Sequence, residues 1–286
     1  FRLDEKGCPI GVYTKVQKEA NQLIEEFMLL ANRRVAEYCA HRMVNGRRVP
    51  RPMVFRVRDE PAEDKLERFR EFALRFGHYF KASKGRSVAK AINKLVTEVK
   101  GRPEENAIQS LAVRSMSKAF YTTDNVGHYG LAFKYYTHFT SPIRRYPDMI
   151  AHRLLARYLA DGKSPDKRTL ESQCVHASER EIVASEAERA SIKYKMVEFM
   201  KDKVGEVFKG HVSGMSEWGI YVELNDTHIE GMAFLRDIED DYYYYDDARF
   251  EVVGRNSGRR IAFGEEVWIR VKGVDMRRRT IDFELI

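Results

Sequence analysis

Residues 127–155 of the chain read GHYGLAFKYYTHFTSPIRRYPDMIAHRLL. The apolar and aromatic run over residues 131–139 is typical of a short buried strand. Ser141 is a suitable helix N-cap and Pro142 a favoured first-turn residue. The stretch therefore predicts a strand that leads into a helix over residues 142–159.

Two adjacent arginines, Arg144 and Arg145, fall in the first turn of this predicted helix. Positive charges there oppose the helix dipole, at a cost of about 0.3 to 1 kcal/mol each when they are exposed. A bound phosphate would offset that cost, because free N–H groups at a helix start and a guanidinium fork both bind anions. The alternative is that Arg144 pairs with Asp148 one turn later while Arg145 points into solvent. The residues alone leave both interpretations open.

The rest of residues 1–203 is predicted to be mainly helical. Residues 1–14 are extended, and the Gly/Pro-bounded segment NGRRVPRPMVFRV predicts a turn and a short strand. Apolar residues at three-to-four spacing and a long polar helical pattern predict five more helices. These helices lie at about residues 15–41, 62–80, 87–99, 103–120 and 168–203.

The pattern changes at Val204, where apolar and polar residues begin to alternate. Five short strands are predicted over residues 204–286, which is the number in an OB-type barrel. An insert, RDIEDDYYYYDDARFEVVGRNSGRR, interrupts them, and its aspartates are interpreted as a solvated loop. The predicted fold class is α+β, with a mainly helical domain over 1–203 and a five-stranded OB-fold barrel over 204–286.

Charge is distributed unevenly along the chain. Residues 1–203 carry 39 Lys and Arg against 26 Asp and Glu, whereas residues 204–286 carry 11 against 17. A polyanion is the natural partner of such a basic region, and a basic surface that serves only solubility is the alternative. No run approaches the roughly 18 apolar residues of a membrane helix. We expect a monomeric cytoplasmic protein with no membrane partner.

Several blocks of the sequence resemble the RNB family of exoribonucleases, which includes ribonucleases R and II. They are GHYGLAFKYYTHFTSPIRRYPDMIAHRLL, LDEKGCPIGV with ANQLIEEFMLLANRRVAEY, AVRSMSKAFYTTDNVGHYGLA and SEREIVASEAERASIKYKMVEFM. The blocks occur in the family order and span essentially the whole chain. The insert with DDYYYYD is more like that of the ribonuclease R members. The C-terminal strands are similar to the OB-fold RNA-binding domain that follows the RNB domain.

The resemblance implies hydrolysis of single-stranded RNA from its 3′ end to nucleoside 5′-monophosphates. It makes residues 1–203 the C-terminal portion of the catalytic domain. The family arginine that touches the phosphate near the scissile bond corresponds to Arg144, where it can stabilise charge developing on the phosphoryl oxygens. The same floor would be lined by His138, Thr140, Ser141 and Tyr146, each of which is otherwise a packing or capping residue.

Two further acidic positions gain a role from the resemblance. Family members place a carboxylate of the IEEFMLLAN block near the ribose hydroxyls of the terminal nucleotide, which assigns RNA binding to Glu26. The sequence does not distinguish Glu25 from Glu26 for this role, and a solvated helix face is the alternative for both. Glu188 corresponds to a family position near the RNA path, with an i,i+4 surface pair as its alternative.

The barrel segment offers rings and cations for RNA. Aromatic residues on an OB fold can stack bases, at about 1 to 3 kcal/mol per base. The predicted RNA-binding residues of this segment are Phe208, Lys209, Trp218, Tyr221, Phe234 and Lys272. The alternative is that at least half of the rings fill the small barrel's core.

Members of the family cut RNA with magnesium held by an Asp-rich block, and residues 1–203 contain no such cluster. We therefore expect Mg²⁺ in the complete enzyme, no metal ligands in this chain, and almost no activity from the chain alone. The initial Phe1 favours a fragment of a longer enzyme. The alternative function is that of a non-catalytic RNA-binding protein that retains the RNA groove.

Overall fold

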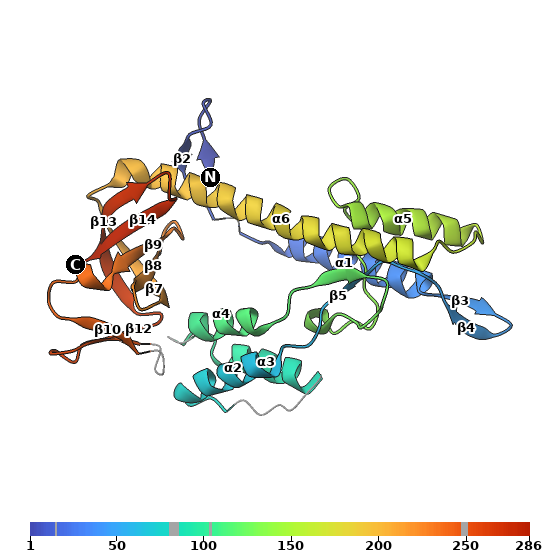
Figure 1. Cartoon of the computed structure of the whole chain (residues 1–286), viewed down its shortest axis with the longest axis horizontal. Coiled ribbons are helices and arrows are strands. Elements are labelled where there is room, and N and C mark those ends of the chain that lie inside the picture. The colour runs from blue at the N-terminus through green and yellow to red at the C-terminus, as the bar shows by residue number, and fades with distance from the viewer. Residues whose placement is uncertain (15, 80–85, 103–104, 247–250) are drawn as a thin grey trace. The chain divides into compact units, whose positions relative to one another are not determined.

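The computed structural model describes residues 1–14, 16–79, 86–102, 105–246 and 251–286. The chain forms two compact units (Figure 1). One comprises Phe1–Lys15, Val99–Ser110 and Glu186–Ile286, and the other comprises Val16–Glu98 and Leu111–Ser185. The predicted division at residues 203/204 stays a prediction, because the compact units are drawn from several separate stretches of the chain.

The unit of residues 16–98 and 111–185 is built mainly from helices. Its helices are α1 (Glu19–Cys39), α2 (Glu63–Arg75), α3 (Arg86–Glu98), α5 (Tyr146–Leu159), the end of α4 (Glu105–Ser115) and the first half of α6 (Lys167–Met200). Its strands form two antiparallel pairs, β3 (His41–Val44) with β4 (Arg47–Pro50), and β5 (Phe55–Val57) with β6 (Phe120–Thr122). A buried cluster joins the end of α1, β5 and α5, and includes Cys39, Phe55, Leu154 and Tyr158. This core fixes the start of α5 relative to α1.

The helices expected from apolar spacing are all present among the described residues. Phe69 and Ala73 are buried on α2, as the spacing predicts, while the predicted start of the fourth helix at Pro103 lies outside the described residues. The apolar stripe of α1 is different, since Leu23, Ile24 and Phe27 are exposed by 58, 59 and 60%. No described element covers that part of α1, and its buried residues lie further along, at Asn32, Ala36 and Cys39.

The second unit contains the predicted barrel. Strands β7 (Val207–Met215), β8 (Gly219–Leu224), β9 (Glu230–Phe234), β13 (Glu266–Asp275) and β14 (Thr280–Leu285) close in the order β13-β14-β9-β8-β7. Inward residues such as Ile220, Val222, Ile269 and Phe283 are fully buried, which is the alternation that predicted these strands. The α+β class with a five-stranded OB-type barrel is confirmed. The unit also contains the short pair β1 (Arg2–Leu3) and β2 (Pro9–Gly11) and the end of α6.

The insert in the barrel segment contains strands, and of the aspartates interpreted as a solvated loop, Asp240 and Asp241 precede these strands, Asp246 ends β10 (Tyr243–Asp246) and Asp247 lies outside the described residues. The insert forms a three-stranded antiparallel sheet from β10, β11 (Glu251–Gly254) and β12 (Arg260–Ala262). The Asp241 carboxylate accepts hydrogen bonds from the backbone N–H groups of Asn256 and Ser257, which holds the β11–β12 connection. The Ser257 hydroxyl, which also donates to this carboxylate, and then these backbone bonds lower the pKa of Asp241 well below its usual range.

Candidate nucleic-acid interface

The segment over 131–139 is not a strand, contrary to the sequence prediction. It makes one backbone hydrogen bond to β5, from Arg56 N to Tyr136 O (2.9 Å), and no ladder. Backbone bonds to His128 and Tyr129 hold residues 131–133 in a tight turn. Side-chain bonds hold the end of the segment, because Thr137 Oγ1 donates to Val54 O (2.7 Å) and Asn32 Oδ1 accepts from Phe139 N (3.0 Å). The end of the segment is therefore fixed without a second pairing strand.

The predicted helix start at Pro142 is also wrong, because α5 begins at Tyr146. Residues 142–144 form a turn in which the N–H groups of Arg144 and Arg145 donate to Ser141 O at 3.3 and 3.1 Å. Asp148 lies in the first turn of α5, and its Oδ2 accepts a hydrogen bond from Ser141 N at 2.8 Å. The side chain of Asp148 therefore closes the turn, and Arg144 precedes the helix instead of lying in its first turn.

The two adjacent arginines have different surroundings. Arg145 Nη2 donates to Asp148 Oδ2 at 2.8 Å, and the Asp148 side chain is 0% exposed. Arg144 is exposed and its side chain forms no ion pair with any other described residue. The alternative expected an ion pair between Arg144 and Asp148, but Arg145 makes that pair instead. Of the two cations, Arg144 is the one available to an anion outside the protein.

Next to this turn lies a half-buried imidazole, that of His138. Its Nδ1 and the Tyr121 hydroxyl are 2.7 Å apart, and its ring contacts that of Tyr136 edge-on. Burial, followed by the positive charges of Arg145, Arg56, His128 and Arg144, lowers the pKa of His138 to about 3. His138 is therefore neutral near pH 7, and it lies in the positive field of the arginines.

Two residues that position this segment were not predicted from the sequence. Asn32 on α1 is buried and also donates from Nδ2 to the Tyr136 hydroxyl at 3.1 Å. Arg56 on β5 pairs with Glu181 of α6 at 2.5 Å, and its guanidinium lies 4.6 Å from the Tyr121 ring centroid. A buried polar residue on an apolar helix stripe, such as Asn32, is the one sequence signal that points to this role.

The remaining residues predicted outside the barrel are two near this turn and two on long helices. Thr140 is half-buried, and Tyr146 is 50% exposed at the start of α5, where it lines a small cavity of about 280 Å³. Glu26 is exposed on α1, and Glu25 accepts a hydrogen bond from Gln17 at 2.9 Å. Glu188 is exposed on the part of α6 that belongs to the other unit, so it is described apart from this segment.

The barrel presents rings on its outer surface. Tyr221 on β8 and Phe234 on β9 point outward, since their neighbours Ile220 and Ala233 are buried inside the barrel. Trp218, just before β8, is 69% exposed, whereas Phe208 packs against the barrel core. The two predicted cations are paired, Lys209 with Glu266 at 2.8 Å and Lys272 with Asp237 at 3.0 Å. Trp218, Tyr221 and Phe234 remain available for stacking, and the RNA-binding roles remain predictions.

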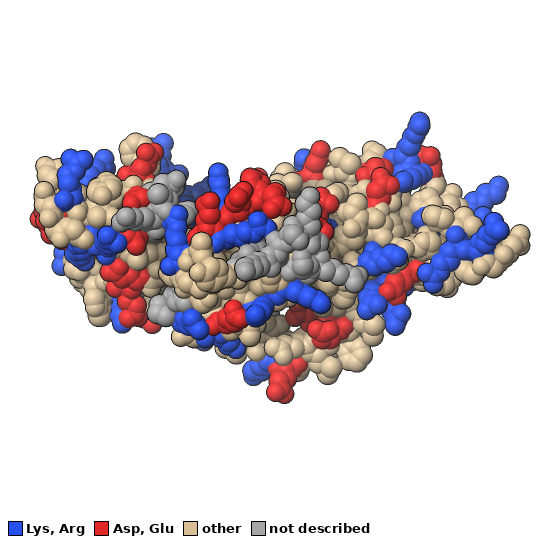
Figure 2. Space-filling view, turned by 90° about the horizontal axis from the view of Figure 1, so that it is seen from below, with Lys and Arg blue, Asp and Glu red and all other residues tan. Residues whose placement is uncertain are grey.

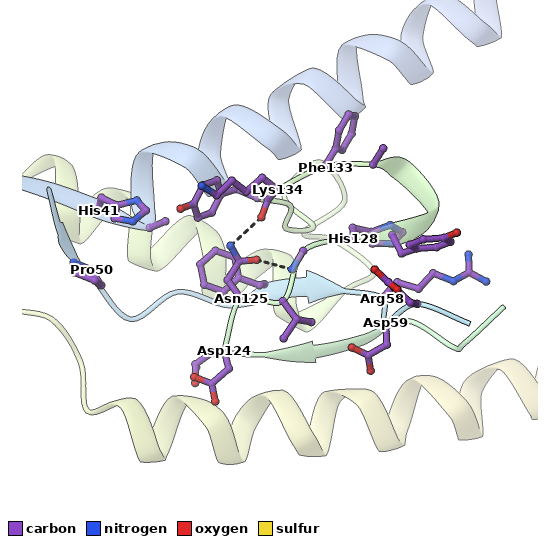
Figure 3. Close-up of a pocket in the computed structure, with 18 of the residues that line it drawn as sticks. His41, Pro50, Arg58, Asp59, Asp124, Asn125, His128, Phe133 and Lys134 are labelled. Atoms are coloured by element: carbon purple, nitrogen blue, oxygen red, sulfur yellow. Dashed lines mark hydrogen bonds between the residues drawn. The ribbon is translucent and has the colours of Figure 1, made fainter. Parts of the chain in front are cut away.

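A cavity of about 910 Å³ lies beside the first part of the 127–155 segment (Figure 3). Its wall includes residues 123–129 and 132–135, held together by hydrogen bonds from Asn125 Nδ2 to Lys134 O and from Gly127 N to Asn125 Oδ1. Five cations and three acids line it, namely Arg51, Arg58, Lys90, Lys134 and Lys167 with Asp59, Glu60 and Asp124. Tyr135 lines the cavity, whereas the neighbouring Tyr136 is buried and accepts a hydrogen bond from Asn32.

A magnesium site does not fit the donor set of the described residues. Mg²⁺ requires oxygen ligands, usually one or two carboxylates with waters. Over the described ranges, no group of three or more His, Cys, Asp and Glu side chains is placed to hold a metal ion. In the same ranges, no helix is long and apolar enough to cross a bilayer.

Comparison with known proteins agrees with this arrangement of domains. The RNB domain family matches residues 1–161, which is more than half of the chain. The chain belongs to the RNB family. In this RNB protein, residues 201–286 match the S1 RNA binding domain, which is the barrel with its insert.

Relatives of this RNB protein include ribonuclease R of Aquifex aeolicus, 37% identical over 99% of this chain and 40% of the relative. The apo form of Mycoplasma genitalium RNase R has the same fold, with a TM-score of 0.88 and 25% identity over 99% of this chain and 44% of that chain. The same enzyme has been solved in complex with ribose methylated single-stranded RNA, and matches with a TM-score of 0.86, 25% identity and the same coverage.

The chain spans about two fifths of the length of these relatives. The resemblance to ribonuclease R is confirmed.

Proposed function

We propose that this chain is the RNA-binding part of a hydrolytic 3′-to-5′ exoribonuclease that degrades single-stranded RNA to nucleoside 5′-monophosphates. The observation that carries the proposal is the RNB match over residues 1–161 joined to an S1 RNA binding domain. Similarity to ribonuclease R over 99% of the chain adds the direction and type of reaction. The basic character of residues 1–203 suits a polyanionic substrate.

Arg144 is our proposed phosphate contact. The Ser141–Asp148 hydrogen bond and the Arg145–Asp148 ion pair fix the turn on which Arg144 lies. Asp148 neutralises Arg145, which leaves the exposed Arg144 guanidinium to bind phosphoryl oxygens by its two-pronged fork. A cation held there in advance stabilises charge that develops on those oxygens during hydrolysis.

Two further groups complete the proposed floor. His138 stays neutral near pH 7, because burial and the neighbouring arginines lower its pKa to about 3, so it contributes a ring and not a charge. Glu26 would accept hydrogen bonds from ribose hydroxyls of the terminal nucleotide. In the complete enzyme we propose Mg²⁺, which would activate water; its ligands are not found among the described residues of this chain.

The test uses the full-length parent enzyme, a 5′-labelled single-stranded RNA and magnesium. Arg144→Ala should lower kcat at least 100-fold while RNA affinity falls only a few-fold, because the contact strengthens in the transition state. Arg144→Lys keeps the charge without the fork, so its kcat should be intermediate. Equal losses of kcat and affinity in Arg144→Ala would show that Arg144 only binds RNA.

The second candidate is a non-catalytic RNA-binding protein, and the lack of a metal-ligand cluster among the described residues favours it. The two candidates differ in the activity of the parent. Release of mononucleotides by the parent, and almost none by the purified chain, supports the exoribonuclease. RNA binding without mononucleotide release by the parent supports the binding protein, and ready hydrolysis by the chain alone contradicts our proposal of an inactive chain.

A further inference from the structure

The hairpin of β3 and β4, residues 41–50, is a basic arm of this RNB protein. Its turn residues Asn45 and Gly46 have φ values of 50° and 76°. Asn-Gly with both residues at positive φ is the preferred two-residue connection between twisted antiparallel strands. The local sequence therefore specifies a regular hairpin here.

Cations dominate this hairpin. It carries Arg42, Arg47 and Arg48 and contains no Asp or Glu. All three arginines are exposed and form no ion pair with the residues that the structure describes. The pKa of His41 at the base of the hairpin is lowered by burial and by the charges of Arg48, Lys134 and Arg51, which shows a locally positive field.

The base of the hairpin is firmly held. Arg51 donates from Nη2 to Tyr38 O at 2.8 Å and from Nε to Cys39 O at 3.3 Å, which satisfies carbonyls at the end of α1. The Arg51 guanidinium also lies 4.1 Å from the centroid of the Tyr158 ring, near the end of α5. A rigid base means that the three free arginines are presented on a fixed support.

The hairpin is distant from the turn that carries Arg144. Its base packs near Tyr158, twelve residues after the start of α5 at Tyr146. At a rise of 1.5 Å per residue, those positions are about 18 Å apart along the helix. In Figure 2, Lys and Arg side chains gather at the right edge of the view, the end where the hairpin lies in Figure 1. A partner that contacts both places must be long.

We propose that the hairpin is a second, sequence-independent contact to the phosphate backbone of RNA, separate from the Arg144 turn. Three unpaired guanidiniums on both faces of an exposed two-stranded ribbon suit a chain of phosphates, and no acid on the ribbon repels them. This inference rests on the proposed function, since it assumes that RNA is the polyanion that reaches the protein.

The test compares a 5-nucleotide and a 25-nucleotide fluorescein-labelled single-stranded RNA by anisotropy at several salt concentrations. The variant Arg42→Gln/Arg47→Gln/Arg48→Gln should bind the long RNA about tenfold more weakly at low salt. The slope of log K against log salt should shrink by about 2, because about 0.7 is lost per phosphate contact on a single strand. Affinity for the short RNA should not change.

Two matched variants serve as controls. Lys6→Gln/Lys65→Gln/Arg68→Gln removes the same charge from exposed positions elsewhere and should keep the wild-type slope to within about 0.5. Arg42→Lys/Arg47→Lys/Arg48→Lys keeps the charge and should retain most of the affinity for the long RNA. Circular dichroism of each variant verifies that it is folded.

The outcomes separate this inference from the proposed function. If the wild-type chain binds neither RNA, the proposed RNA binding is contradicted. If the wild type binds the long RNA and the hairpin variant does so with the same slope, only the hairpin inference is overturned. It is also overturned if the variant loses binding to vesicles of phosphatidylserine and phosphatidylcholine while its RNA binding is unchanged.

Discussion

The half-buried imidazole of His138 makes the stability of its unit depend on pH, and the size of the effect can be calculated. In the folded chain the pKa of His138 is about 3, compared with 6.5 for an unperturbed histidine. Above pH 6.5 the residue is neutral in both states and contributes no pH dependence. As the pH falls below 6.5, His138 becomes protonated in the unfolded chain but stays neutral in the folded chain. The free energy of unfolding therefore decreases.

The size of this effect follows from the two pKa values. At pH 5, protonation of His138 in the unfolded chain costs the fold about 2 kcal/mol, and the cost at pH 7.5 is close to zero. His138→Gln removes the titration and keeps an acceptor for the Tyr121 hydroxyl. Between pH 7.5 and pH 5, the free energy of unfolding should therefore fall by about 2 kcal/mol less in His138→Gln than in wild type.

The assay is urea unfolding followed by circular dichroism at 222 nm. That signal reports the helices, whereas both tryptophans, Trp218 and Trp268, lie in the barrel and would report the other unit. His176→Gln on the exposed side of α6 is the matched control and should follow the wild-type pH dependence. Equal pH dependence of wild type and His138→Gln would refute the reasoning, because His138 would then titrate in the folded chain.

Two other substitutions test the turn and the barrel. Asp148→Asn should destabilise the helical unit by about 3 kcal/mol in urea unfolding, because it leaves the Arg145 guanidinium, only 21% exposed, without its partner. A loss below about 1 kcal/mol would mean that the ion pair does not hold the turn. Trp218→Ala/Tyr221→Ala should weaken binding of single-stranded RNA by about 2 to 6 kcal/mol if each ring stacks one base. Phe208→Leu, at a ring packed on the core, should leave RNA affinity unchanged, and equal losses in the two variants would indicate damage to the barrel instead.

Periodicity predicted the helices and the barrel because burial imposes it directly. Inward residues of β8 such as Ile220, Val222 and Leu224 alternate with outward ones, and Phe69 and Ala73 of α2 follow helical spacing. Periodicity failed where long-range side-chain bonds decide the conformation. Asn32 holds the segment that was expected to be a strand, from more than 100 positions away in the sequence.

The candidate site was predicted in part. The resemblance singled out Arg144, and the structure exposes it, although its role in binding phosphate has yet to be tested. Neither spacing nor resemblance could show that Arg145 takes Asp148 as its partner, since i,i+3 and i,i+4 pairs are both possible on a helix. Asp148 also explains why α5 begins at Tyr146 and not at Pro142. Its carboxylate accepts a hydrogen bond from Ser141 N and stabilises a turn where a first helical turn was expected.

We propose that the 3′ end of RNA reaches the turn that carries Arg144. The most direct measurement is photo-cross-linking of the full-length parent to single-stranded RNA with a 3′-terminal 4-thiouridine, followed by mass spectrometry of the linked peptides. We expect cross-links within residues 138–146. Cross-links of the 3′ end confined to other parts of the protein, with none in this segment, would contradict it.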